Sequence, residues 1–314
     1  MEISVIIPAH NPDAGRLRRT LAALRAQTLP ATGWETVLVD NASSPALVRA
    51  DWNADAPANL RLVVEPEPGL SHARRCGFLA GQGDFFVLVD DDNVLAPDYL
   101  EETLRLFAAH KKVGMFGGRS TPEFEHTPDP WVREFDNLIA CRDLGPAPQI
   151  SHGLRNPVTG RNEYPPFAPM GAGMALRRAA AQSWLEQGNH AALPDRRGGE
   201  LTSSGDNDIV LAAMTAGWEA AYFPTLHLTH LIPAFRTTRD YLARLNRGIQ
   251  KSWMQVLARH DANPWPPIPR WTVPLRKFKA WFACRAWSSV AAHIRWQGVC
   301  GHFDGLASLT SFSP

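Results

Sequence analysis

Residues 85–93 read Phe85-Phe86-Val87-Leu88-Val89-Asp90-Asp91-Asp92-Asn93, an apolar run that ends in three consecutive carboxylates. The apolar part predicts a strand that is buried on both faces. The acids then lie at its carboxyl end, where open α/β sheets bind ligands. Crowded carboxylates are unstable unless a cation neutralises them, and a divalent metal that carries a diphosphate meets this need. The alternative is that one Asp caps the helix beginning near Pro97 and that the other two are solvated. This alternative accounts easily for one carboxylate at a buried strand end, but less well for three.

The sequence on either side alternates between strand and helix patterns. Strands are expected at residues 3–8, 34–40, 60–65, 85–89 and 113–116. Helices are expected where Leu17, Leu21 and Leu24 recur at helical spacing, from a cap at Ser71 through Ala80, and over residues 97–110. This succession predicts an α/β fold with a mostly parallel sheet flanked by helices and joined by right-handed crossovers.

Composition excludes several classes of protein. A chain of 314 residues with 45% hydrophobic residues can bury a full α/β core, and its net charge of +1 gives no nucleic-acid signature. The sequence opens on a strand without a signal core, and no apolar run is long enough to cross a bilayer. We therefore expect a cytoplasmic chain that is not exported. Reduced thiols are expected at the scattered cysteines, Cys76, Cys141, Cys284 and Cys300.

The common nucleotide-binding signatures are missing from the sequence. It has no G-x-x-x-x-G-K-[ST], and no G-x-G-x-x-G follows the first strand. Polar loops instead follow the first two strands, Pro8-Ala9-His10-Asn11-Pro12 and Asp40-Asn41-Ala42-Ser43-Ser44. Together with the three acids, they place polar groups at three strand ends on one edge, which predicts a ligand crevice.

Six segments, in order over roughly residues 3 to 232, resemble inverting family 2 glycosyltransferases of the GT-A fold. The first two are residues 3–11 and 39–44. Residues 69–77 resemble G-x-[SA]-x-A-R-N-x-G with Arg75 in place of Asn, and residues 90–92 match D-x-D. Residues 171–178 resemble G-x-x-x-A-x-[RK]-[RK]. Residues 204–209 fall where the family has G-E-D-x-[ED]-[LI], with Gly205 in place of the first acid.

The resemblance implies a role for each matching residue. Asp40 would contact the nucleotide base, Asp90 the ribose, and Arg74 the nucleotide; Pro8 and Asp91 would complete the donor site. Asp92 would ligate the divalent metal, Mn²⁺ or Mg²⁺, and His230 aligns with a family histidine near the metal or diphosphate. With Gly205 in place of an acid, Asp206 alone inherits the role of general base.

Each of these assignments has a structural alternative. Asp40 fits an Asx turn with Ser43 or Ser44, Arg74 a surface ion pair, and Asp206 a helix N-cap. His230 fits a structural histidine. The alternatives for neighbouring residues are that Arg75 is a solvated helix residue, that Asp208 is a first-turn acid or a positioner, and that His227 lies on the opposite face of an extended segment from His230.

The chemistry agrees with these residue types. Inverting transfer needs a base for the acceptor hydroxyl and charge stabilisation on the departing diphosphate. The expected function is metal-dependent transfer from a nucleoside-diphosphate sugar, UDP-sugar favoured, to a glycan or lipid-linked acceptor in cell-surface polysaccharide synthesis. A sugar nucleotidyltransferase is the rival, although it requires a Gly-rich basic loop after the first strand. The other alternative, prompted by Gly205, is a catalytically weak nucleotide- or carbohydrate-binding scaffold.

The expected catalytic domain spans residues 1–235, with a nucleotide-sugar half at 1–118 and an acceptor half at 119–235. Prolines break the pattern between residues 119 and 170, which predicts a loop-rich, acceptor-facing insertion. Arg155, Arg161 and Tyr164 in this insertion either bind sugars and phosphates or pack the loop.

A helical region is expected over residues 236–314, beginning with a helix from Thr238 to Arg259. No acid occurs from Ala262 through Phe303, where Lys and Arg alternate with Trp. This composition is typical of a helix on an anionic membrane surface, here the inner face of the cell membrane. The alternative is a helix that closes onto the catalytic domain; nucleic acid is not an expected partner.

Overall fold

The computed structural model describes residues 1–188, 201 and 203–309, and its sheet begins with four parallel strands. They lie in the order β3 (Leu60–Glu65), β2 (Trp34–Asn41), β1 (Ile3–Ala9) and β4 (Phe85–Leu88). Every residue of β1 and β2 is buried, as continuous apolar runs predict for strands covered on both faces. This half of the sheet confirms the predicted parallel arrangement.

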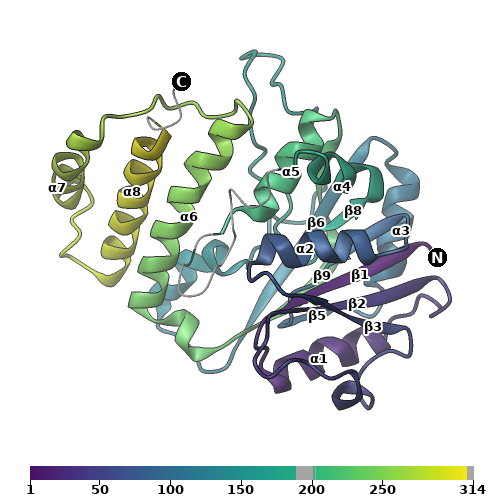
Figure 1. Ribbon diagram of the computed structural model, residues 1–314. Coiled ribbons are helices and arrows are strands. Elements are labelled where there is room, and N and C mark those ends of the chain that lie inside the picture. Colours follow the sequence, from purple (N-terminus) through teal and green to yellow (C-terminus); the bar gives the residue numbers. More distant parts are fainter. Residues whose placement is uncertain (189–200, 202, 310–314) are drawn as a thin grey trace.

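Helices cover both faces of this sheet (Figure 1). On one face, α1 (Ala14–Arg25) and α3 (Tyr99–Ala109) share a hydrophobic core with β1. On the other face, α2 (Leu70–Ala80), α4 (Arg178–Leu185) and α5 (Gly205–Thr215) form a second core. A Cβ on Gly77 would lie only 2.3 Å from Ile6 Cγ2, so glycine permits the close approach of α2 to β1.

The second half of the sheet is mixed. The short strand β8 (Ala175–Arg177) runs antiparallel to β4 and to β6 (Val113–Phe124), while β6 and β9 (Glu219–Ile232) are parallel. The short strands β5 (Asn93–Leu95) and β7 (Gln149–Ile150) pair antiparallel with β9. Strand β6 therefore extends well beyond the segment expected at residues 113–116, and β9 runs beside it over most of its length.

Two local expectations need correction. Gly69, with φ 144°, caps α2 at its N-terminus, and Ser71 is buried inside the helix instead of capping it. The region at 119–170 also holds more regular structure than expected, because β6 continues to Phe124 and a 3-10 helix covers Pro130–Ile139. A second 3-10 helix, Arg49–Trp52, lies between β2 and β3.

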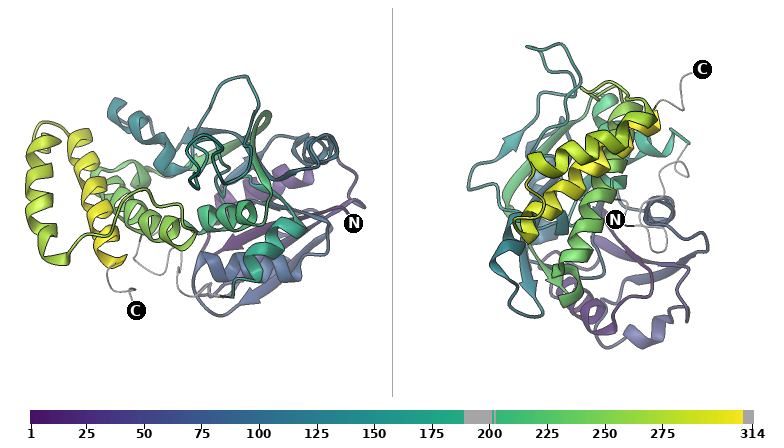
Figure 2. Two further views of the ribbon diagram at one scale, coloured as in Figure 1. Left: turned by 90° about the horizontal axis from the view of Figure 1, so that it is seen from above. Right: turned by 90° about the vertical axis from the view of Figure 1, so that its left-hand side faces the viewer.

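Three helices form the C-terminal region (Figures 1 and 2). The helix expected from Thr238 is α6 (Arg239–Arg259), and the Thr238 hydroxyl caps it by accepting the Tyr241 N–H. The last helix, α8 (Val290–Leu309), packs along α6, and α7 (Val273–Ala283) packs on α8 at the outer edge of the molecule. A short 3-10 helix, Arg270–Thr272, precedes α7.

Among the described helices, none combines the length and the apolar character that a bilayer-spanning segment needs.

Candidate active site

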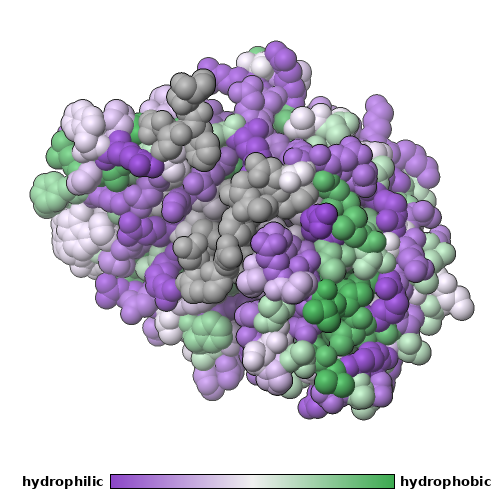
Figure 3. Space-filling view, in the orientation of Figure 1, coloured by the Kyte–Doolittle hydropathy of each residue, from purple (hydrophilic) through white to green (hydrophobic). Residues whose placement is uncertain are grey.

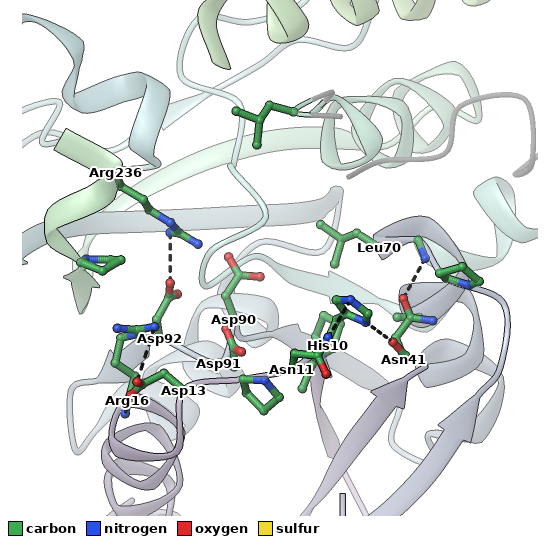
Figure 4. Close-up of a pocket in the computed structure, with 18 of the residues that line it drawn as sticks. His10, Asn11, Asp13, Arg16, Asn41, Leu70, Asp90, Asp91, Asp92 and Arg236 are labelled. Carbon is green, nitrogen blue, oxygen red and sulfur yellow. Dashed lines mark hydrogen bonds and ion pairs between the residues drawn. The ribbon is translucent and has the colours of Figure 1, made fainter. Parts of the chain in front are cut away.

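A cavity of about 330 Å³ lies at the carboxyl ends of β1, β2 and β4, on the edge where the polar strand ends were expected to meet (Figure 4). Asp92 and Arg236 point toward one another on one side of it, and His10 and Asn41 lie on the other. The loop after β1, the start of α2 and the acid triplet contribute further lining residues, among them Pro8, Asn11, Gly69, Leu70, Asp90 and Asp91.

The acids of the triplet have different environments. Asp92 is buried, with its Oδ1 3.1 Å from His230 Nε2 and its Oδ2 3.0 Å from Arg236 Nη1. Burial lowers the pKa of His230, but the Asp92 carboxylate outweighs this effect and the pKa rises to about 10. For Asp91, burial and the charges of Asp92 and Asp90 raise the pKa to about 7. Asp92 is thus balanced by two cations, whereas Asp90 and Asp91 are crowded together beside it.

The pair Asp92 and His230 can contribute two ligands to a metal, provided that metal binding releases the proton that the Asp92 carboxylate holds on His230. Within the described residues, no group of three or more His, Cys, Asp or Glu side chains is arranged to hold an ion. Mg²⁺ typically binds through one or two carboxylates together with substrate phosphates and water, without an all-protein cage. The residues present therefore fit a divalent cation that binds jointly with a diphosphate.

The two histidines of β9 face opposite sides, as strand alternation predicts. His230 is buried beside Asp92, whereas His227 is exposed and its Nε2 lies 2.9 Å from Thr121 Oγ1. Only His230 therefore belongs to the acid cluster.

Sequence reasoning missed Arg236. This residue lies in the 3-10 helix Ala234–Thr237, just before α6, and its Nη1 is also 3.3 Å from His230 Nε2. Arg236 lies one residue past residue 235, the predicted end of the catalytic domain. The only available signal was a cation six residues after His230, because the contact with Asp92 joins segments far apart in the chain.

Asp40 closes its own loop. The buried carboxylate accepts the Ser43 N–H at 3.1 Å and the Leu47 N–H at 2.9 Å, the Asx-type arrangement that was the structural alternative. Its neighbour Asn41 lines the cavity instead and accepts the Gly69 N–H at 2.8 Å, which orients the entry to α2. The contact between Asp40 and a nucleotide base stays a prediction.

Arg74 and Asp206 come together at Gly171. Arg74 is buried in α2 and does not lie at the surface, whereas Arg75 is exposed. A Cβ on Gly171 would lie 2.3 Å from Arg74 Nη2 and 3.5 Å from Asp206 Cβ. Glycine at this position therefore lets the loop pass beside both side chains.

Asp206 lies in the first turn of α5, after the N-cap residue Ser204. Its Oδ2 accepts the Gly171 N–H at 2.8 Å and its Oδ1 accepts the Asn207 N–H at 2.9 Å. The half-buried carboxylate is therefore fixed against the loop that begins the 171–178 segment. An ionised carboxylate offers about four acceptor positions, so capacity remains for a hydroxyl donor.

Asp208 has a different environment. It is buried and accepts hydrogen bonds from Trp184 Nε1 at 2.8 Å and Arg259 Nη1 at 3.3 Å, and His260 Nε2 lies 2.9 Å away. Burial raises the pKa of Asp208, but these partners outweigh it and the pKa is lowered. Asp208 thus connects α5 to the end of α6, which agrees with a positioning role.

A second hollow, of about 1020 Å³, lies between the 155–164 loop and the end of α6. Arg155, Arg161 and Tyr164 line it together with Trp253 and Trp265. The Tyr164 hydroxyl donates to Asn207 Oδ1 at 2.7 Å, which links this hollow to the turn that carries Asp206.

Comparisons with known proteins agree with this geometry. Residues 4–183, more than half of the chain, match the model of glycosyl transferase family 2. Hyaluronan synthase of Streptococcus pyogenes is 31% identical over 113 residues, 34% of this chain and 26% of that protein. An O-antigen biosynthesis protein of Myxococcus xanthus is 29% identical over 136 residues, 39% of this chain and 10% of that protein. The chain thus spans about a quarter or less of the length of these relatives.

Among solved structures, a mannosyltransferase from Pyrobaculum calidifontis in complex with GDP-Man and Mn²⁺ has a TM-score of 0.55 at 18% identity. The match covers 100% of this chain and 76% of that one, and it shows a shared fold.

Proposed function

Because the chain belongs to glycosyl transferase family 2, we propose that it moves a sugar from a nucleoside-diphosphate donor to an acceptor hydroxyl, with inversion at the anomeric carbon. The carboxylate cluster in the cavity of this GT-A fold is the observation that carries the proposal. In this proposal Asp90 would bind the ribose, and the Asp92–His230 pair would bind a metal that carries the diphosphate. UDP-sugars are the favoured donors, with GDP- and dTDP-sugars as the other candidates.

Asp92 and His230 would hold the Mn²⁺ or Mg²⁺ ion, which when bound acts as a Lewis acid on the departing diphosphate. Asp206 would accept the proton of the attacking acceptor hydroxyl. Backbone N–H groups fix both oxygens of Asp206, so the base is oriented before the acceptor arrives. Arg74, buried beside Asp206, would provide positive charge near the nucleotide.

A glycan or lipid-linked acceptor in cell-surface polysaccharide synthesis is the proposed substrate. The names of the two sequence relatives support this class, and the hollow at Tyr164 gives the acceptor half an aromatic and arginine-lined surface. The proposed location is the inner face of the cell membrane, where the enzyme would be peripheral.

The proposed function is tested by its products. Nucleoside diphosphates (UDP, GDP and dTDP) are screened with Mn²⁺ for an increase in unfolding temperature, since a specific ligand at 100 times its Kd stabilises by about 2.7 kcal/mol. The sugar nucleotide of the best base is then supplied, and NMR follows the released diphosphate and the anomeric configuration. A nucleotidyltransferase would instead consume a nucleoside triphosphate and release pyrophosphate. Binding without turnover on any acceptor would favour the scaffold alternative.

Arg236→Ala should shift two affinities in opposite directions. Arg236 occupies the same carboxylate that a metal would bind, and it lines the cavity. In the variant Mn²⁺ alone should bind more tightly, because no guanidinium competes for Asp92. The nucleoside diphosphate should bind roughly tenfold more weakly, because a charged hydrogen-bond donor is lost.

Titration calorimetry measures both affinities, with Arg236→Lys as the matched variant that keeps the charge but loses the planar fork. Unchanged affinities in Arg236→Ala would remove Arg236 from the donor site.

A further inference from the structure

We propose that the outer face of α7 docks on an anionic lipid bilayer through a stripe of exposed apolar side chains. This inference deepens the membrane location contained in the proposed function and rests on it. The stripe consists of Trp271, Leu275, Phe278, Phe282 and Trp287, each between 54% and 81% exposed. Leu275, Phe278 and Phe282 follow one another at spacings of three and four residues, so they lie on one face of α7. Trp271 lies in the 3-10 helix just before α7, and Trp287 lies just after it.

The structure divides the tryptophans of this region into two groups. Trp281 and Trp296 pack edge to face with ring centroids 4.7 Å apart, and Trp296 Nε1 donates to the Lys277 carbonyl at 3.1 Å. These two rings join α7 to α8. Trp271 and Trp287 are exposed, and the Trp287 ring also lies beside Trp281, with centroids 6.4 Å apart. Trp281 and Trp296 therefore hold the two helices together, whereas Trp271 and Trp287 are accessible to a partner.

The stripe is continuous from Phe278 to Trp287, and it lies at the edge of the molecule. Phe278 and Phe282 have ring centroids 5.1 Å apart, and Phe282 and Trp287 are 5.6 Å apart. The opposite side of α7 is buried through Val273 and Ala280, against the rest of the C-terminal region. Figures 1 and 2 show α7 as the outermost helix, and in Figure 3 some hydrophobic residues lie among pale and hydrophilic ones at the left edge, where α7 lies. Contiguous exposed apolar patches mark interaction sites, unlike single exposed apolar residues.

The charge of this face selects the partner. The exposed cations Arg276, Lys279 and Arg285 accompany the stripe, and the sequence has no acid between residues 262 and 303. The nearest following acid, Asp304, is already paired with Lys277 at 2.6 Å and with Arg247 at 2.8 Å. Long cationic side chains can bury their stems along apolar surface while the charged ends remain at the headgroups.

The dimensions of α7 also fit this partner. An α-helix of 11 residues is about 16 Å long, too short to cross a bilayer but suited to lying in its interface. An apolar stripe, flanking cations and the absence of acids together match an anionic lipid surface better than a protein groove.

The experiment is vesicle flotation of the full chain. Neutral vesicles contain phosphatidylcholine alone, and anionic vesicles contain 30% phosphatidylglycerol. The full chain should float with anionic vesicles at low salt, dissociate in part at high salt, and bind neutral vesicles weakly. The double variant Trp271→Ala/Phe278→Ala should lose at least about tenfold in binding. The double variant Lys279→Gln/Arg285→Gln should bind anionic vesicles roughly fivefold more weakly for each charge removed, and its binding should depend much less on salt.

Matched controls use equally exposed residues elsewhere. Val64→Ala/Leu79→Ala removes apolar side chains that are 64% and 59% exposed, and Lys111→Gln/Lys112→Gln removes two exposed cations. Both should float like the unmodified chain. All substituted side chains are exposed, so unfolding temperatures should change little, and a large change would be detected before flotation is interpreted.

Two results would overturn the proposal: a full chain that does not bind anionic vesicles at low salt, or a stripe variant that binds as well as its control. A dimer in solution that the stripe variant abolishes, without vesicle binding, would assign the stripe to a second copy instead. Metal-dependent nucleotide binding is measured on the same variants and should be unchanged. A failure of the membrane inference is thereby distinguished from a failure of the proposed chemistry.

Discussion

Asp206→Asn is expected to lower the rate of sugar transfer by roughly 100-fold or more, the scale of general-base catalysis. An amide has the shape of the carboxylate but cannot take the acceptor proton. Its single carbonyl oxygen can keep one of the two bonds from Gly171 N and Asn207 N, so the stability loss should be about 1 kcal/mol. Turnover is measured as released nucleoside diphosphate, and donor affinity, measured by calorimetry, should stay close to that of the unmodified protein.

Asp208→Asn provides the control two residues away. Asp208 holds Trp184, Arg259 and His260, so this variant should lower the unfolding temperature more than the intrinsic rate. Near-normal transfer by Asp206→Asn, together with a slow but stable Asp208→Asn, would move the base to Asp208.

Asp92→Asn is expected to abolish metal-dependent binding of the nucleoside diphosphate. The substitution removes the charge that a divalent ion requires and leaves the Arg236 and His230 side chains without their shared carboxylate. Calorimetry with and without Mn²⁺ should show that the metal no longer improves affinity. Chelation of metal from the unmodified protein should reproduce this result, so it does not depend on how well the variant folds.

Asp90→Asn is the comparison within the triplet. It should weaken nucleotide binding through the ribose while the effect of the metal persists. If Asp90→Asn loses the metal effect and Asp92→Asn retains it, the roles of the two acids are exchanged.

The parallel strands could be predicted because local runs of apolar residues indicate buried strands. β1 and β4 are short apolar runs that end in polar residues, and the edge strand β3 coincides with the predicted segment at residues 60–65. The lengths of β6 and β9 could not be predicted in this way. Their outer parts mix polar and apolar residues, and they are strands because they pair with each other over residues 113–124 and 219–232.

Some residues of the candidate site could likewise be predicted from the sequence, and others could not. The acid triplet, Asp206 and His230 belong to motifs that order along the chain makes recognisable. Arg236 and the Arg259–His260 pair have no such signal, because their partners Asp92 and Asp208 are distant in sequence. The sequence also could not separate Trp281 from Trp271, since the packing of α8 decides which side of α7 is buried.

The placement of α6 has a consequence for how substrates meet. This helix of 21 residues, about 32 Å long, starts beside Arg236 at the acid cluster and ends at Arg259, whose guanidinium holds the helix of Asp206. It also supports α8 and, through it, α7. The acid cluster, Asp206 and the outer stripe are therefore all connected to α6. If α7 docks on a bilayer as proposed, α6 would fix the orientation of the donor cavity relative to the membrane, and a lipid-linked acceptor would reach it by diffusion within the leaflet.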